Sequence, residues 1–254
     1  MSKSLSWYLN YLDGVRNAGK NREELYPNYA ADNTLNEHET PNELLLPESY
    51  KKCKELVISA GFKREIEWQE SVNIELLTES NFLQEYAWVT LSSGMKEQII
   101  RNIFERFSQV FFKWESAKII SDNTPTCRQL ALQLFANRNK VNAIITTSRI
   151  ISKFGFPEIK KLIKTNPYDT LRGLPYIGPV TYFHLAKNIG IQVAKPDRHL
   201  TRFAADFGFP NVQELCSFLS YKTGDSIPVI DIVLWRYATF TKNAPLSFLR
   251  LLSG

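Results

Sequence analysis

The chain has 254 residues, of which 44% are hydrophobic and 22% charged, a composition ordinary for a globular protein of one large domain or two modest lobes. This composition excludes wholesale disorder, and eleven Gly and twelve Pro exclude a collagen-like or low-complexity architecture. Three widely separated Cys exclude a disulfide framework and a Cys-bound zinc or iron–sulfur centre, and only three His are available for any other metal site.

Charge is unevenly distributed along the chain, although the formal net charge is only +5. Residues 101–165 contain twelve Lys/Arg and four Asp/Glu, a net charge of +8. Residues 1–80 contain nine basic and fourteen acidic side chains, a net charge of −5. Such asymmetry between segments indicates an anionic partner, with nucleic acid as the first candidate, but the charge alone still favours a set of solvated helix faces.

The N-terminus does not resemble a secretory signal, because Asp13 and Arg16 interrupt it before an apolar core forms. No apolar run approaches the roughly 18 residues of a membrane-spanning helix. We therefore expect an intracellular protein without a membrane partner. In a bacterial source it would be cytoplasmic and close to the nucleoid, and we expect a monomer.

Hydrophobic periodicity and helix punctuation predict a mainly α fold. In the N-terminal part we expect a short helix at 5–17, an irregular polar segment at 20–47 and a helix at 48–60 that ends at Gly61. The segment 64–77 mixes both periods and stays undecided. From residue 79 onward the predicted helices are 80–92 (capped by Ser80), 97–112, one beginning at Thr124-Pro125, 140–153 (opened by Asn139), 157–165, 179–189, 198–207, 211–220 and 228–241.

The most informative stretch is 171–207, LRGLPYIGPVTYFHLAKNIGIQVAKPDRHLTRFAADF. A tight connector from Gly173 to Gly178 joins two helices, and Pro179 suits the first position of the second helix. Gly178 permits a positive φ. Free N–H groups at a helix N-terminus can bind a backbone phosphate without reading base sequence. From these residues alone, an ordinary helix–helix turn is the alternative.

This segment resembles the hairpin of the helix-hairpin-helix DNA glycosylase superfamily (endonuclease III-like), whose consensus is Leu-Pro-Gly-Val/Ile-Gly-x-x-Thr-Ala. The matching residues are Leu174, Pro175, Ile177, Gly178 and Thr181, whereas Tyr176 and Tyr182 replace a usual glycine and alanine. A catalytic Asp follows the hairpin in that superfamily, at the start of the next helix. In KPDRHLTR the matching positions are Asp197, His199 and Arg202.

Two further segments resemble the same superfamily. Residues 82–104 resemble its first core helix and the following loop, with Leu91-Ser92-Ser93-Gly94 in place of Leu-Ser-x-Gln, and 229–238 resemble its closing helix. The resemblance covers roughly 80–242. It implies a two-lobed helical glycosylase-like fold with a helix-hairpin-helix core at 80–242. Residues 1–79 would then be a helical or irregular extension packing on that core, and 243–254 a C-terminal tail.

The resemblance implies that Asp197 is the catalytic carboxylate, which stabilises positive charge on the deoxyribose and orients or deprotonates a water. A structural cap is its alternative role. Bifunctional members carry a Schiff-base Lys where this chain has Val180, so a monofunctional glycosylase that leaves an abasic site is expected. Lys187 and Lys195 match no motif position, and surface or phosphate roles are expected for them.

The resemblance also implies a DNA duplex with a flipped base as partner. No cofactor is required, with a monovalent cation at the hairpin as an optional addition, and no metal site is expected. The hairpin residues expected to bind DNA are Gly173, Pro175, Tyr176, Ile177, Gly178, Pro179, Val180 and Thr181. The candidates for a base pocket or DNA contact are Glu85, Tyr86, Trp88, Ser92, Met95 (as a wedge), Tyr182, His184, His199 and Trp235, with core packing as the alternative for most of the aromatic residues.

Several functional readings stay open at this point. The excised base is an alkylated or deaminated lesion in a repair enzyme, or a hypermodified base of phage DNA in a defence enzyme. A non-catalytic helix-hairpin-helix DNA-binding module is the second class. A helical adaptor, which binds a protein through its acidic N-terminal region, is the third.

Overall fold

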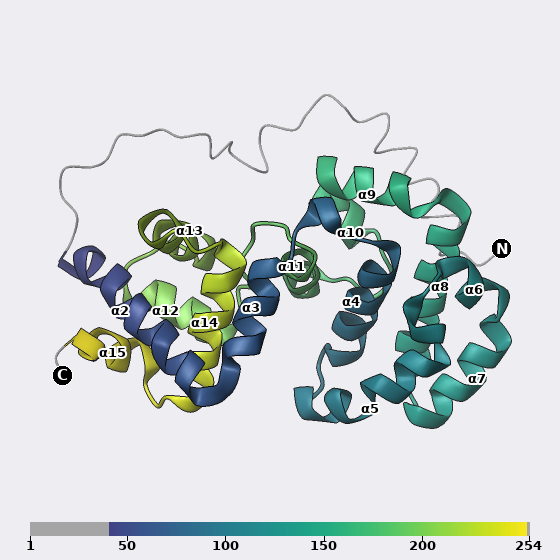
Figure 1. The fold of residues 1–254 in the computed structure, drawn as a ribbon, viewed down its shortest axis with the longest axis horizontal. Coiled ribbons are helices and arrows are strands. Elements are labelled where there is room, and N and C mark those ends of the chain that lie inside the picture. Colours follow the sequence, from purple (N-terminus) through teal and green to yellow (C-terminus); the bar gives the residue numbers. More distant parts are fainter. Residues whose placement is uncertain (1–40, 253–254) are drawn as a thin grey trace. The chain divides into compact units, whose positions relative to one another are not determined.

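The structure is a computed structural model that describes residues 41–252, with the side chains of 41–44 and 252 left aside. These residues are mainly α-helical and contain no β-strand (Figure 1). From residue 41 onward the chain forms one compact unit. The helix expected at 5–17 lies outside the described residues. Within the described range, no helix has the length and apolar character needed to cross a membrane.

The helices follow one another with short connections. In the first half of the described range they are α2 (Pro41–Val57), η1 (Ile58–Phe62), α3 (Lys63–Ser71), η2 (Ile74–Leu76), α4 (Glu79–Ser92), α5 (Glu97–Val110), η3 (Phe112–Trp114), α6 (Ala117–Asp122), α7 (Thr124–Leu134) and α8 (Arg138–Phe154). In the second half they are α9 (Phe156–Thr165), α10 (Pro167–Arg172), α11 (Pro179–Asn188), α12 (Arg198–Asp206), α13 (Val212–Thr223), α14 (Ile227–Phe240), α15 (Ala244–Leu249) and η4 (Arg250–Leu252).

The mainly helical prediction is confirmed for the described residues, but several boundaries differ. The irregular segment expected at 20–47 is wrong for residues 41–47, which belong to α2 despite Pro47 in its interior. The residue that caps α4 also differs from the prediction. Thr78, not Ser80, accepts a hydrogen bond from the Asn81 backbone N–H at the start of α4 (3.1 Å). Three further short helices, α6, α10 and α15, were not predicted as separate elements.

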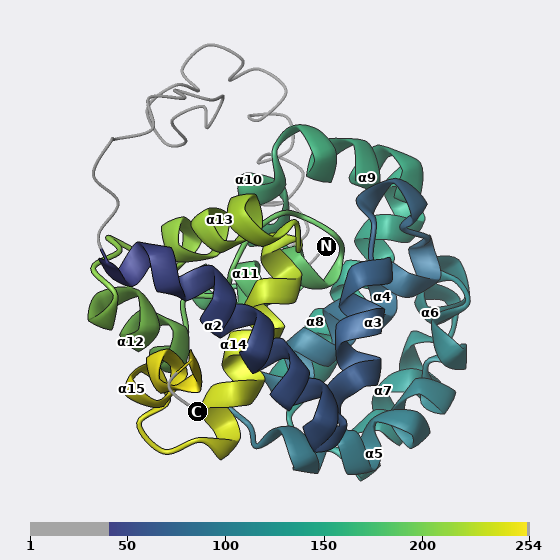
Figure 2. The same ribbon diagram turned by 60° about the vertical axis from the view of Figure 1, so that its left-hand side comes forward.

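One hydrophobic cluster joins helices that are far apart in the sequence. It combines α2 and α3 with α12–α15, and these segments lie side by side in Figure 2. Tyr50 of α2 and Phe203 of α12 are buried in it, and so is Phe248 of α15, within the expected C-terminal tail. Burying a large apolar side chain stabilises the fold by roughly 1.5–3 kcal/mol. The described part of the N-terminal region is therefore integral to this cluster.

Helix α4 is held by side chains of other elements. It packs against α8, α5 and α11. The Tyr86 hydroxyl donates to the Pro175 carbonyl in the connector that precedes α11 (2.5 Å). At the C-terminal end of α4, the buried Lys140 ammonium of α8 donates to the carbonyls of Leu91 (2.7 Å) and Ser93 (2.5 Å). These bonds supply partners for carbonyls at the helix end and fix the loop that follows it.

The end of α11 approaches the segment before η2 so closely that only glycine fits there. Gly190 has a φ of +94°, and a Cβ on it would lie 2.5 Å from the Ile74 backbone nitrogen. Gly208, which follows α12, also has a positive φ (+81°), but a Cβ there would meet nothing within 4 Å. A side chain at either glycine would strain the backbone, but only a side chain at Gly190 would also clash with neighbouring atoms.

We predict that Gly190→Ala destabilises the protein more than Gly208→Ala. Both variants place a side chain in the left-handed region, which costs about 1–2 kcal/mol. Gly190→Ala adds a clash with backbone atoms, for which overpacking costs of about 1–3 kcal/mol are typical. Urea unfolding of the two variants measures the difference. Equal losses of unfolding free energy would contradict the close approach at Gly190.

Candidate functional site

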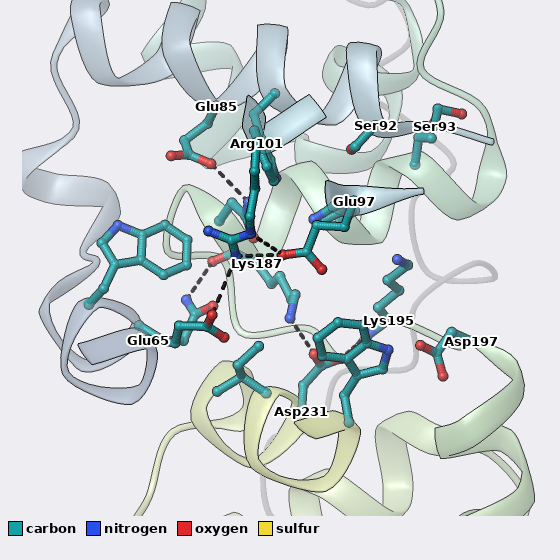
Figure 3. Close-up of a pocket in the computed structure, with 18 of the residues that line it drawn as sticks. Glu65, Glu85, Ser92, Ser93, Glu97, Arg101, Lys187, Lys195, Asp197 and Asp231 are labelled. Carbon is teal, nitrogen blue, oxygen red and sulfur yellow. Dashed lines mark hydrogen bonds and ion pairs between the residues drawn. The ribbon is translucent and has the colours of Figure 1, made fainter. Parts of the chain in front are cut away.

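A cavity of about 780 Å³ lies among α3, α4, α5, α11 and α14 and the residues just before α12 (Figure 3). Its volume is within the range of about 300–1,000 Å³ that is usual for small-molecule sites. The wall carries three tryptophans, Trp68, Trp88 and Trp235, together with charged side chains from each surrounding element. The cavity therefore combines flat apolar surfaces with polar groups.

Asp197 lies on the wall of this cavity, as the N-cap of α12. Its Oδ1 accepts hydrogen bonds from the backbone N–H groups of His199 (2.9 Å) and Leu200 (3.1 Å). Bonds of this kind at a helix N-terminus stabilise a negative charge. Its Oδ2 has no hydrogen-bond partner among residues 41–252, and the side chain is half-buried. The residue is thus a helix cap that still has a free carboxylate oxygen.

A buried ion pair fixes the segment that leads to Asp197. The Lys187 ammonium of α11 pairs with Asp231 Oδ1 of α14, and both side chains are almost fully buried. Asp231 Oδ2 accepts a hydrogen bond from the backbone N–H of Lys195 (2.6 Å). Since Lys195 is two residues before Asp197, the pair orients the backbone that carries the carboxylate.

Lys195 contributes an amine to the cavity wall. In the part of the chain that the structure describes, its Nζ forms neither an ion pair nor a hydrogen bond. Burial lowers the pKa of this amine, and the Lys187 charge lowers it further, against the attraction of Asp197. Surface or phosphate roles were expected for Lys187 and Lys195. The structure instead buries Lys187 and places Lys195 on the cavity wall.

Glu85 of α4 lies in the same cavity, and in the view of Figure 3 Lys187 is drawn between it and Asp197. Its Oε2 accepts a hydrogen bond from the Asn188 side-chain amide (2.8 Å). Burial raises the pKa of this carboxyl to about 7, although the hydrogen bond from Asn188 opposes the shift. The pKa of His184 is lowered, because burial and then the charges of Lys195 and Lys187 hold it well below 6.5. At neutral pH the imidazole is therefore uncharged.

A network of ion pairs holds the cavity wall between α3, α5 and α14. The Arg236 guanidinium binds both oxygens of Glu65 (2.5 and 2.7 Å), and Arg101 binds Glu97 (2.5 Å) and Glu65 (3.3 Å). The two guanidinium groups also lie over tryptophan rings of the wall, at 5.5 Å (Arg101) and 4.4 Å (Arg236) from the ring centroids. This arrangement fixes the aromatic surfaces.

The structure brings nine of the eighteen sequence-predicted site residues together in the cavity, and six hairpin residues (Gly173, Pro175, Tyr176, Ile177, Gly178 and Pro179) are not among them. Those that line the cavity are Glu85, Trp88, Ser92, Met95, Val180, Thr181, His184, Asp197 and Trp235. Three pocket candidates do not line it. Tyr86 and Tyr182 are buried in the core, where Tyr182 packs against Tyr168 (4.9 Å between ring centroids), and His199 lies beside Arg198.

The connector before α11 differs from the sequence-based expectation in one detail. Gly178 has a φ of −92°, so the positive φ that a glycine permits is not adopted there. The left-handed residue is Tyr176, with a φ of +68°, at the position where the consensus has glycine. The Gly178 N–H donates to Thr181 Oγ1 (2.6 Å). The backbone N–H groups of Val180 and Thr181 have no acceptor in the described chain. Val180 is 52% exposed, so this helix start is accessible.

Several site residues lie outside the predicted set. Glu65, Trp68 and Gln69 of α3 come from the segment whose secondary structure was undecided. Their spacing of three and four residues places them on one face of a helix, a signal that would have grouped them. Gln69 is buried, its Nε2 donates to the Lys187 carbonyl (3.1 Å), and its Oε1 lacks a partner in the described range.

No protein-family model, curated protein or solved structure matches this chain. Among the described residues, no group of three or more His, Cys, Asp or Glu is arranged to hold a metal ion.

We predict that Glu85→Gln stabilises the protein at high pH but not at low pH. The folded-state pKa of about 7 exceeds the ordinary value of 4.5, so the carboxyl takes up a proton on folding between these two values. Stability then falls as pH rises across that window, by an amount on the order of 3 kcal/mol. The amide does not titrate, so urea unfolding at pH 8 should show a gain for Glu85→Gln that is absent at pH 5.

Glu105→Gln is the matched control, because Glu105 is exposed on α5 and does not line the cavity. Its unfolding free energy should follow that of the wild type at both pH values. A Glu85→Gln variant with the same pH dependence as the wild type would contradict the raised pKa.

Proposed function

We propose that this protein is a monofunctional DNA glycosylase, which hydrolyses the N-glycosidic bond of a damaged or modified base and leaves an abasic site. The observation that carries the proposal is the position of Asp197. Asp197 has a free carboxylate oxygen and lies on the wall of a cavity large enough for a nucleobase, and Val180 and Thr181 at the accessible start of α11 line the same cavity. The two-lobed helix-hairpin-helix architecture and the monomeric state are part of this proposal.

The chemistry follows from this arrangement. A nucleotide that is flipped out of the duplex inserts its base between flat surfaces such as Trp88 and Trp235. As the C1′–N bond breaks, its electron pair goes to the departing base and positive charge develops on the deoxyribose. The Asp197 carboxylate stabilises that charge and accepts a proton from the water that adds to C1′. The products are the free base and an abasic site.

DNA binding is assigned to the start of α11 and to the basic segment 101–165. The N–H groups of Val180 and Thr181 bind a backbone phosphate in a manner independent of sequence. Tyr176 adds an exposed ring on the same connector, with the Lys140 ammonium 5.6 Å from its centroid. Binding of this kind weakens with salt, as expected for phosphate contacts.

One observation favours a bulky substrate. The cavity volume of about 780 Å³ leaves space beyond a single nucleobase. This supports a hypermodified base, such as those of phage DNA, as the second candidate within the enzyme class, with a role in defence. A non-catalytic DNA-binding module is the alternative outside that class, because the start of α11 binds phosphate without any need for Asp197.

We predict that Asp197→Asn lowers base release by at least about 100-fold, the lower end of the usual contribution of a general base. Asparagine caps helices about as well as aspartate, so the fold and the affinity for duplex DNA should persist. The assay incubates the protein with duplexes that carry a panel of damaged and modified bases and then quantifies abasic sites and strand breaks.

The matched control is Asp206→Asn, at the exposed end of the same helix, which should act as the wild type does. Base release that survives Asp197→Asn would refute the assigned mechanism.

Abasic sites should form in intact strands, because Val180 cannot form an imine. A nick without added base or heat would contradict this, and Lys195 would then be the first amine to replace.

A further inference from the structure

Two carboxyl groups of the cavity are in opposite environments. Asp197 receives two backbone N–H bonds and has a free oxygen. Glu85 receives one bond, from the neutral side-chain amide of Asn188 on α11. Environments that move the pKa values of two carboxyl groups apart in this way are typical of a site in which one group acts as a base and the other as an acid.

The hydrogen bond from Asn188 also determines where a proton on Glu85 resides. Because Glu85 Oε2 accepts from the Asn188 amide, Oε2 acts as the carbonyl oxygen and the proton occupies Oε1. Oε1 has no partner among the described residues, and Glu85 lines the cavity. In its protonated form the residue therefore offers one O–H donor to a cavity ligand. Trp88, one helical turn later, also lines the cavity and provides a flat surface for the ring of that ligand.

The charged groups that face Glu85 from the surrounding elements do not hold it ionised. Lys187 of α11 is paired with Asp231 of α14, Arg101 of α5 with Glu97, and Arg236 of α14 with Glu65 of α3. His184 of α11 is uncharged at neutral pH. From α8, Lys140 is bound to two carbonyls at the end of α4. Arg64 and Lys195 also line the cavity, and neither is bonded to Glu85.

We propose that Glu85 is the general acid of this site, and that the substrate carries an uncharged base which Glu85 protonates as the base leaves. The proposal rests on the proposed function. An uncharged base would depart with a negative charge, and a proton on a ring nitrogen or carbonyl oxygen removes that penalty. A base that is already cationic through N-alkylation departs without such help. The carboxyl therefore selects uncharged damaged or modified bases as the substrate class.

The step balances without a co-reactant. The C1′–N bond breaks with its electrons going to the base, while the Glu85 Oε1 proton moves to an acceptor atom of that base. Water adds to C1′ and gives its proton to Asp197. Proton exchange with solvent restores both carboxyl groups, so the net reaction is hydrolysis. In this step Glu85 gives up a proton and Asp197 accepts one.

The test is a single-turnover measurement of base release between pH 5.5 and 9. The duplexes contain uracil, hypoxanthine, 5-hydroxymethylcytosine or its glucosylated form as uncharged bases, and 7-methylguanine as a cationic one. For an uncharged base, the wild-type rate should fall about tenfold per pH unit above a pH of about 7. Glu85→Gln should be slower by about 100-fold or more at pH 6 and should lose this pH dependence.

Glu105→Gln is the control and should reproduce the wild-type profile, and thermal melting at pH 6 verifies that Glu85→Gln is folded. Release of 7-methylguanine alone, or an unchanged rate and profile for Glu85→Gln on an uncharged base, would overturn the role of Glu85 and leave the glycosylase intact. No release from any duplex by the wild type would instead refute the proposed function, and the role of Glu85 with it.

Discussion

The buried ion pair between Lys187 and Asp231 is the interaction on which the site depends. It joins α11 to α14, and the second carboxylate oxygen of Asp231 accepts a hydrogen bond from the backbone N–H of Lys195, two residues before the Asp197 cap. Removing one partner of a buried pair leaves an unpaired charge, at a typical cost of about 3–5 kcal/mol. The pair also engages the Lys187 ammonium, and Glu85 has no ion-pair partner among the described residues. The Lys187–Asp231 pair thus positions the segment that carries Asp197 and leaves Glu85 without an ion-pair partner.

A second consequence concerns the rigidity of the cavity. Arg101 and Arg236 are shared between carboxylates and tryptophan rings, so the aromatic walls and the ion pairs support one another. Lys140 and Tyr86 fix α4 to α8 and to the connector before α11. A site whose walls are fixed before the ligand arrives loses little entropy on binding.

Local signals were sufficient for most of the helices and for the cap at Asp197. Gly155, Gly190 and Gly208 follow the helices that were expected at 140–153, 179–189 and 198–207, and each has the positive φ that glycine tolerates. Asp197 after Pro196 was identifiable because a helix cap depends on adjacent residues. Helix α15 was missed because its stability depends on Phe248, which packs on Phe203 from a distant part of the sequence (5.4 Å between ring centroids).

Long-range pairing also explains what was missed in the site. The partner of Lys187 is 44 residues away at Asp231, and no periodicity connects the two. Trp68 and Gln69 reach the cavity from α3, outside the region of resemblance. The glycine-to-tyrosine change at 176 was visible in the sequence, but its effect, a tyrosine in the left-handed region, required the backbone.

The proposed function requires this cavity to release a base from DNA. The most direct measurement is mass spectrometry of the small-molecule fraction after the protein is incubated at low salt with lesion-containing duplexes and with hypermodified phage DNA. We expect a free base in equal amount to new abasic sites, in strands that remain intact. DNA binding without any free base from any of these substrates would refute glycosylase activity and leave a DNA-binding module.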